Sequence, residues 1–167
     1  MNNEPLAYFI TFTIYGTFLQ GDARWWRSRD KGLRSPQPNL EKWHRHRLNH
    51  DILLLNELQR LAVESEVKRF CEYRGWHLWK CNPRSNHVHL VASARSVTGE
   101  KVRDQVKANC TRVLREKWKC FEGRPVWSVG GDWQCINTED DLEQVIAYVA
   151  DAQDLKKLDP KISAGRP

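Results

Sequence analysis

No apolar run in this 167-residue sequence approaches the roughly 20 residues that a membrane-spanning helix needs. The N-terminus also lacks the charged and then apolar pattern of a secretory signal. Zinc knuckles and disulfide scaffolds are disfavoured too, because the five cysteines are odd in number, widely spaced and form no CxxC pair. We therefore expect a reduced, cytoplasmic protein that does not bind membranes.

Basic residues outnumber acidic ones by 27 to 21, which gives a net charge of +6 and a pI near 9.2. Such a balance favours a polyanionic partner. The length fits one domain with a sizeable core. We expect that domain over residues 1–155, with a long basic loop at about 21–50 and a C-terminal tail over 156–167.

Tryptophan is frequent, with eight residues, and several lie among arginines and lysines. Aromatic faces interleaved with cations suit single-stranded nucleic acid, whose bases stack while its phosphates are neutralised. The alternative is that some of these indoles are core or amphipathic surface, and we prefer it for Trp76, Trp79 and Trp127. The candidate DNA-binding residues are Trp25, Trp26, Arg27, Lys42 and Arg45 in the loop, and Lys107 and Arg112 on a predicted helix.

Hydrophobic periodicity predicts an α+β fold with the element order strand, helix, strand, strand, helix, strand, helix. In the second element, Leu54, Leu58, Leu61, Ala62 and Phe70 recur at helical spacing. The predicted strands cover residues 7–14, 76–81, 86–91 and 133–136, with a turn at 82–85, and the helices cover about 56–73, 99–118 and a segment opened by Thr138. The first six elements match a ferredoxin-like βαββαβ sandwich, an antiparallel sheet covered by helices on one face.

Two histidines stand out in the third predicted strand, Asn86-His87-Val88-His89-Leu90-Val91. Because side chains alternate along a strand, His87 and His89 project from one face while Val88 and Leu90 point to the other. A pair of imidazoles on a rigid strand can present two metal ligands. The alternative is two half-exposed histidines on a solvated sheet face.

In the predicted topology the first and third strands are central neighbours, so the histidines would lie mid-sheet on the open face. The last helix, laid across that face, could bring further groups to them. Tyr148 lies at the edge of the apolar stripe of that helix. It is either an amphipathic packing tyrosine or a candidate nucleophile. A phenol has an ordinary pKa of about 10, so attack on a phosphodiester would need a polarising metal ion.

These features together resemble the single-tyrosine HUH transposases, the family that includes the REP-associated tyrosine transposases. The HUH signature, histidine-hydrophobe-histidine, is met by His87-Val88-His89. The resemblance extends over most of the chain from Tyr8 to Gln153. It is carried by residues 8–21 (YFITFTIYGTFLQG), 84–91 (RSNHVHLV), 125–127 (PVW) and 148–153 (YVADAQ).

The resemblance implies a metal-dependent endonuclease and strand transferase that acts on single-stranded DNA, with hairpin-forming ends as its substrate. Tyr148 would form a 5′-phosphotyrosine, and His87 and His89 would ligate Mg²⁺ or Mn²⁺. A polar residue of the tyrosine helix would complete the metal site. In the family pattern this residue is a glutamine one turn after the tyrosine, where this sequence has Ala152. The candidate is Gln153, five residues after the tyrosine and about 140° away around a helix, and Asp151, on the side of the tyrosine, is the alternative. The resemblance also allows a homodimer.

Two other functions remain open at this point. One is a DNA-binding or regulatory protein of the same fold whose chemistry has lapsed or been reassigned. The other is an unrelated histidine–metal hydrolase, which would require further clusters of histidine, aspartate or glutamate. His44, His46 and His50 lie in the unpatterned loop, where the HxH spacing is more simply part of a basic run.

Overall fold

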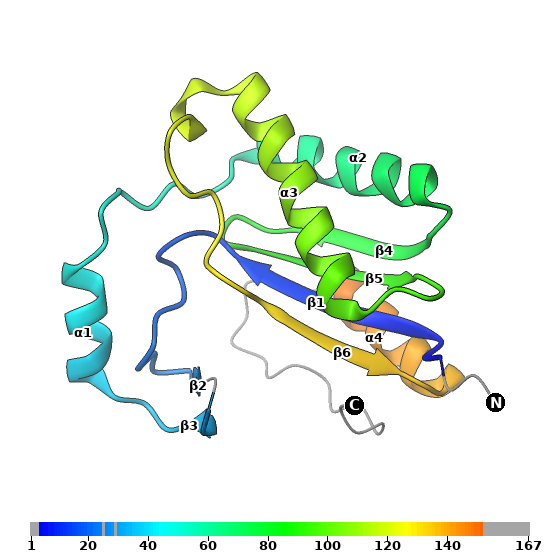
Figure 1. Ribbon diagram of the computed structural model, residues 1–167, viewed down its shortest axis with the longest axis horizontal. Helices are drawn as coiled ribbons and strands as arrows, with labels where there is room; N and C mark the ends of the chain where they lie inside the picture. The colour runs from blue at the N-terminus through cyan, green and yellow to red at the C-terminus, as the bar shows by residue number, and fades with distance from the viewer. Residues whose placement is uncertain (1–3, 25, 29, 152–167) are drawn as a thin grey trace.

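The computed structural model describes residues 4–24, 26–28 and 30–151 (Figure 1). Its centre is a four-stranded antiparallel sheet in the order β4 (His77–Pro83), β5 (His87–Ser93), β1 (Ala7–Thr13) and β6 (Asp132–Ile136). The first and third strands of the predicted core, β1 and β5, are indeed neighbours. The α+β class is confirmed, and the sheet is compatible with a ferredoxin-like fold.

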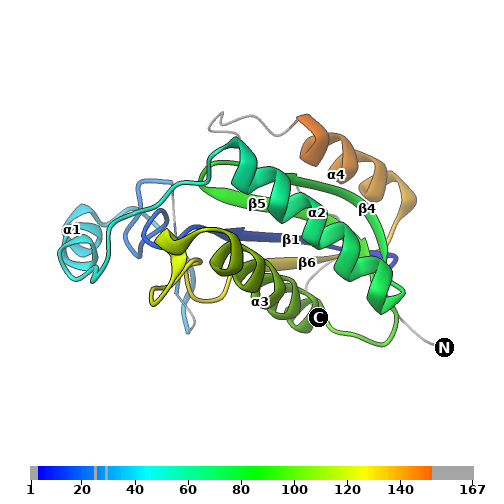
Figure 2. The same cartoon turned by 90° about the horizontal axis from the view of Figure 1, so that it is seen from above.

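Helices cover both faces of the sheet. Helices α2 (Glu57–Arg74) and α3 (Gly99–Lys117) lie on one side, and α4 (Glu139–Asp151) lies on the other (Figure 2). A 3-10 turn, η1 (Lys119–Phe121), follows α3. None of the helices described is both long and apolar enough to cross a lipid bilayer.

Alternation along the strands divides the core into two layers. The larger layer lies between the sheet and helices α2 and α3, and it contains Ile10, Phe12 and Leu90. The smaller one, beneath α4, joins Phe9 and Val91 of the sheet to the helix. The predicted stripe of α4 is confirmed in Leu142, Val145 and Val149, which are buried in this layer, and in Ile146, which is half-buried against it. All five cysteines are free thiols.

Helix α2 has the predicted limits. Asn56 and Gln59 form a reciprocal capping box at its N-terminus, and Gly75 ends it in the left-handed region at φ 68°. The leucines that suggested the helix are nevertheless exposed, with Leu58 at 67% and Leu61 at 53%. The buried side is instead formed by Gln59, Val63, Glu66, Val67, Phe70 and Cys71.

The prediction of an unstructured loop over residues 21–50 is wrong in part. This segment contains a hairpin of β2 (Trp26–Ser28) and β3 (Gly32–Arg34), followed by helix α1 (Pro38–His46). Proline favours the first turn of a helix, where no amide donor is needed. No residue of α1 is buried, and this short helix contains only two large apolar residues, Leu40 and Trp43.

The turn predicted at residues 82–85 begins later than expected. Strand β4 continues through Asn82 and Pro83, which pair with His89 and Val88. A proline is tolerated here because β4 is an edge strand, so its missing amide costs no ladder hydrogen bond. The extension places Asn82 directly beside His89.

Candidate functional site

Strand β5 presents the two histidines on the face covered by α4. In the register, His87 lies opposite Thr13 of β1 and His89 lies opposite Thr11. The two imidazole rings are 4.5 Å apart between centroids, at an interplanar angle of 70°. Because side chains two residues apart on a strand lie on the same face, the sequence brings both imidazoles to one point of the sheet.

Each imidazole is oriented by a hydrogen bond at Nδ1. The Nδ1 atom of His87 is 2.6 Å from Oδ1 of Asn86, and the Nδ1 atom of His89 is 2.8 Å from Oγ1 of Thr11. An amide oxygen only accepts, so Nδ1 of His87 donates its proton to Asn86. Hydrogen bonds of this kind orient histidine ligands in metal sites.

His89 is buried, with 5% of its surface exposed. Burial, together with smaller effects of the nearby His87 and Arg84, lowers the pKa of this imidazole to about 3. The ring is therefore neutral at physiological pH. Neutral imidazole is the protonation state that can coordinate a metal ion.

Tyr148 of α4 lies next to this pair. Its ring is 5.6 Å from the ring of His89 and 6.0 Å from the ring of Phe9, in edge-to-face geometry. The tyrosine is half-buried at the margin of the layer beneath α4. The helix thus brings the predicted nucleophile to the histidines from 59 residues further along the chain.

The position of α4 is fixed by packing and by one polar contact. Leu142, Val145 and Val149 bury the helix against the sheet. Nδ2 of Asn82 donates a hydrogen bond to the carbonyl oxygen of Val149 at 2.8 Å. At the start of the helix, the amide of Asp141 donates to Oγ1 of Thr138 at 3.1 Å, so Thr138 caps the helix that it was predicted to open.

The donor chemistry here fits a divalent cation in part. Two imidazoles face one side of the sheet, and Asp151 is exposed at the end of α4. Within the described residues, no group of three histidine, cysteine, aspartate or glutamate side chains is close enough to hold a metal ion. Gln153, the predicted third ligand, lies outside the described residues.

The predicted DNA-binding residues of the 21–50 segment have different environments. Trp26 is 7% exposed and donates from Nε1 to the carbonyl of Ser35, so its ring is packed within the segment. Lys42 and Arg45 are exposed on α1, and Arg45 forms a 2.6 Å ion pair with Glu41. Trp25 lies outside the described residues, as does the side chain of Arg27.

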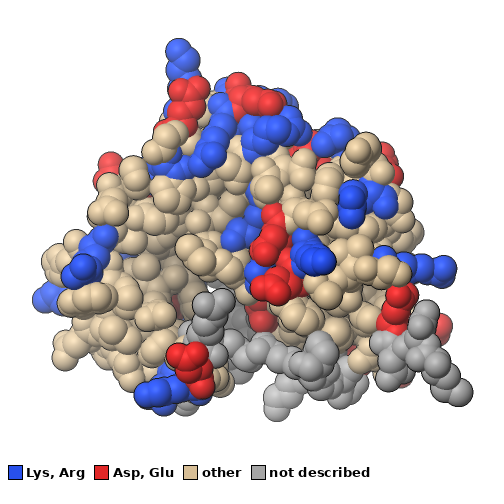
Figure 3. Space-filling model, viewed as in Figure 1, with Lys and Arg blue, Asp and Glu red and all other residues tan. Residues whose placement is uncertain are grey.

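Lys107 and Arg112 of α3 lie on the other side of the sheet from the histidines. Nζ of Lys107 donates to the carbonyls of Ser128 and Gly130, and Arg112 pairs with Glu66 and Glu116. Acidic and basic side chains are interspersed over this face (Figure 3). Of the two cations predicted on α3, Arg112 is therefore paired with carboxylates and Lys107 is bound to backbone carbonyls.

The sequence pattern did not identify three polar residues of the site. Thr11 and Asn82 come from strands on either side of β5, and Asn86 directly precedes the first histidine. Only Asn86 had a local signal, because it adjoins the histidine motif. The other two are 78 and 67 residues from their hydrogen-bond partners, so strand register alone brings them there.

No family model and no curated protein matches this chain. Among solved structures, the chain is similar to a crystal structure described as a “putative transposase” from Deinococcus radiodurans R1. The TM-score is 0.48 at 12% sequence identity, and the alignment covers 87% of this chain and 89% of that chain.

Proposed function

We propose that this protein is a metal-dependent endonuclease and strand transferase, a transposase, that acts on hairpin-forming ends of single-stranded DNA. The observation that carries the proposal is the position of the Tyr148 ring 5.6 Å from that of His89, which itself lies 4.5 Å from that of His87. A tyrosine beside two oriented imidazoles joins a nucleophile to a pair of candidate metal ligands. The resemblance of the HVH and tyrosine motifs to the HUH transposases supports the same reaction.

In this reaction the phenolic oxygen of Tyr148 attacks the scissile phosphorus. The new bond between the tyrosine oxygen and phosphorus replaces the bond to the 3′-oxygen, which leaves as a hydroxyl. The phenol releases its proton to solvent, and the 3′-oxygen takes up a proton from solvent. One phosphodiester is thus exchanged for another, so the step is reversible and a second 3′-hydroxyl can rejoin the strand. This reversibility is what strand transfer requires.

His87 and His89 would hold the cation, Mg²⁺ or Mn²⁺, with Gln153 or Asp151 as a further ligand from the tyrosine helix. When bound, the cation polarises the scissile phosphate and stabilises its developing negative charge. Asn86 and Thr11 keep the two imidazoles oriented. Phe9 and the layer beneath α4 hold the tyrosine ring beside them.

The proposal is tested by mixing the protein with Mn²⁺ and labelled single-stranded hairpin oligonucleotides taken from DNA that flanks its gene. We expect a protein–DNA adduct that resists denaturation and is abolished by Tyr148→Phe and by His87→Ala. Tyr73→Phe is the matched control, because Tyr73 is 76% exposed on α2 and should leave adduct formation unchanged. An adduct that persists in Tyr148→Phe would refute the assignment of the nucleophile.

The same measurement separates the competing function. Tight, salt-sensitive binding with no adduct on any DNA end would indicate a DNA-binding or regulatory protein whose chemistry has lapsed. Loss of the adduct in Tyr148→Phe together with retained binding would instead separate the chemical step from recognition.

A further inference from the structure

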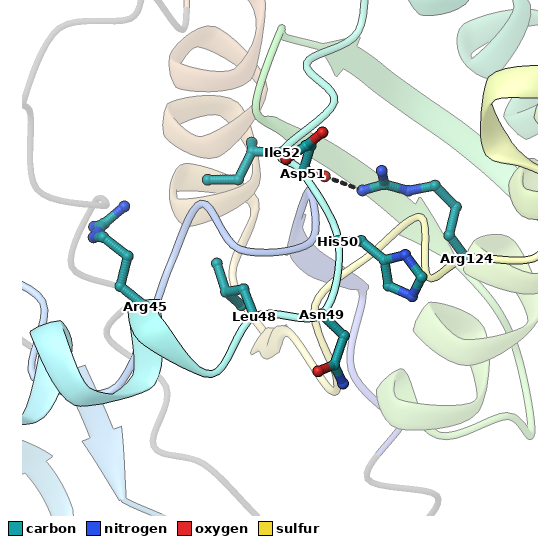
Figure 4. A pocket seen from close by; sticks show the side chains of 7 residues that line it. All are labelled: Arg45, Leu48, Asn49, His50, Asp51, Ile52 and Arg124. Carbon is teal, nitrogen blue, oxygen red and sulfur yellow. Dashed lines mark hydrogen bonds between the residues drawn. The ribbon is translucent and has the colours of Figure 1, made fainter.

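A pocket of about 630 Å³ opens where the segment between α1 and α2 meets the segment that connects η1 to β6 (Figure 4). Its polar lining includes Arg45, Asn49, His50, Asp51 and Arg124. Sites for small organic ligands commonly have volumes of about 300–1,000 Å³, so a single nucleotide is within the range that this pocket can hold. None of the residues around it was assigned a role from the sequence except Arg45.

Arg124 is the cation of the pocket that is held by a backbone carbonyl and an aromatic ring. Its Nη2 donates to the carbonyl of Asp51, and its guanidinium lies over the ring of Tyr15, 5.9 Å from the centroid. Its own carbonyl accepts a 2.9 Å hydrogen bond from Arg115. No carboxylate of the described chain lies within ion-pair distance of Arg124, so its charge is available to an anion.

Aromatic and amide groups lie beside this cation. The rings of Tyr15 and His50 are 6.1 Å apart in edge-to-face geometry, and the hydroxyl of Tyr15 accepts a hydrogen bond from the amide of Asn49 at 3.0 Å. In Figure 4, His50 and Arg124 lie on one side of the connecting segment, and Arg45 lies on the other. The groups suit a base and a phosphate, since bases stack on aromatic rings and guanidinium groups bind phosphate.

The pocket lies at the end of the sheet that carries His87. Three backbone hydrogen bonds connect the segments that flank the pocket to this end of the sheet. The amide of Ile14 donates to Asn86, that of Leu55 to Ser85 and that of Tyr15 to Val126, at 2.8, 2.8 and 3.0 Å. Tyr15 follows strand β1 by two residues, and the last residue of that strand, Thr13, is the register partner of His87. A DNA strand that leaves the histidines at this end would therefore meet the pocket.

We propose that this pocket binds a nucleotide of the single-stranded substrate close to the scissile phosphodiester. Arg124 contacts its phosphate, and His50 and Asn49 receive its base. The pocket thereby sets the position of the strand over the histidines. This inference rests on the proposed function, because the scissile position is defined by that reaction.

The test measures binding of a single-stranded oligonucleotide by fluorescence anisotropy in EDTA, where no cleavage can contribute. Arg124→Gln should weaken binding and reduce the slope of log affinity against log salt by about 0.7, the value for one phosphate contact on a single strand. His50→Ala should weaken binding without changing that slope. Lys68→Gln, an exposed lysine of α2, is the charge-matched control and should match the unmodified protein.

Position along the strand is tested with oligonucleotides that carry one neutral methylphosphonate linkage at successive sites. At one linkage, the neutral methylphosphonate should make the affinities of the unmodified protein and of Arg124→Gln equal. This linkage should lie within the first few nucleotides on one side of the cleavage point. Should Arg124→Gln fail to fold, as judged by its thermal unfolding, His50→Ala and the methylphosphonate series still decide. Unchanged affinity and salt slope in both variants would overturn the pocket assignment.

Failure of the pocket and failure of the proposed function give different results. If the unmodified protein forms the adduct while Arg124→Gln and His50→Ala bind and react normally, only the pocket assignment is wrong. If no adduct forms but Arg124→Gln still reduces the salt slope, the assignment of the nucleotide site is supported and the proposed nuclease activity is wrong.

Discussion

The side chain of Asn82 on β4 is hydrogen-bonded to the carbonyl of Val149 on α4, with 2.8 Å between Nδ2 and the oxygen. Asn82 is the register partner of His89, and Val149 directly follows Tyr148. One amide thus connects the strand beside the buried histidine to the helix turn that carries the tyrosine. This contact fixes the helix relative to the histidine pair.

Replacing Asn82 with alanine should therefore slow adduct formation more than it weakens DNA binding. The loss of one hydrogen bond should lower the free energy of unfolding by about 1 kcal/mol. Asn109→Ala is the matched control, because Asn109 also donates to a backbone carbonyl, that of Gln105, but on α3. Equal slowing in both variants, measured as the rate of adduct formation at saturating DNA, would contradict a positioning role for Asn82.

The Thr11→Val substitution should weaken metal binding while preserving the shape of the side chain. Without the 2.8 Å hydrogen bond to Nδ1, His89 loses the group that orients its ring, and the affinity for Mn²⁺ should fall by about tenfold or more. Titration of Mn²⁺ followed by electron paramagnetic resonance measures this affinity directly. Imidazole ¹⁵N shifts of the metal-free protein should show the proton of His89 on Nδ1 in the unmodified chain.

Thr13 provides the control for that experiment. It lies two residues further along β1, opposite His87, and its side chain makes no hydrogen bond in the described structure. Thr13→Val should therefore leave the affinity for Mn²⁺ unchanged. If both valine variants bind Mn²⁺ like the unmodified protein, Thr11 has no part in metal binding.

The elements that could be predicted from sequence are those with a strong local pattern. Strand β5 alternates histidines with buried apolar residues, and its facing was predictable from that alternation alone. Asn56 and Gly75 mark the ends of α2 by capping chemistry, which is also local. These signals require no knowledge of the rest of the chain.

What could not be predicted depends on tertiary packing. Leu58 and Leu61 have helical spacing, but α2 packs through a face that includes the polar Gln59 and Glu66. Glu66 is accommodated there because Arg69 and Arg112 pair with it, and these arginines hold the pKa of its carboxyl below the usual value. The hydrophobic pattern alone carries no information about such ion pairs.

Lys107 illustrates the same limit for a predicted binding residue. Its position on the polar side of α3 suggested a contact with phosphate, but its Nζ is 2.8 and 2.6 Å from the carbonyls of Ser128 and Gly130. Burial lowers the pKa of this amine to about 8, with Arg103 contributing in the same direction. The lysine is thus held within the fold by the turn before β6.

Replacement of Lys107 with methionine should loosen that turn without affecting DNA binding. We expect faster hydrogen exchange at the amide of Ser128, which donates to the carbonyl of Thr13 at 2.9 Å. The salt slope of single-stranded DNA binding should stay unchanged, and the exposed Lys101→Met serves as the control on the same helix. A decrease in that slope of about 0.7 for Lys107→Met alone would instead place a phosphate contact at Lys107.

The burial of His89 predicts how stability varies with pH in the metal-free protein. Its pKa is lowered from 6.5 to about 3, chiefly by desolvation, so between these values the unfolded chain binds a proton that the folded chain does not. The free energy of unfolding must therefore fall as the pH falls below about 6.5. Because proton binding is linked to unfolding, this group should lower the free energy of unfolding by about 2 kcal/mol between pH 7 and pH 5.

Urea unfolding in EDTA across this pH range measures the effect. His89→Gln removes the titrating ring, so the free energy of unfolding of this variant should change less with pH than that of the unmodified protein. The exposed His46→Gln should retain the full dependence. Parallel curves for the unmodified protein and His89→Gln would mean that His89 can be protonated in the folded state near pH 6, which would contradict a dry, neutral imidazole beneath α4.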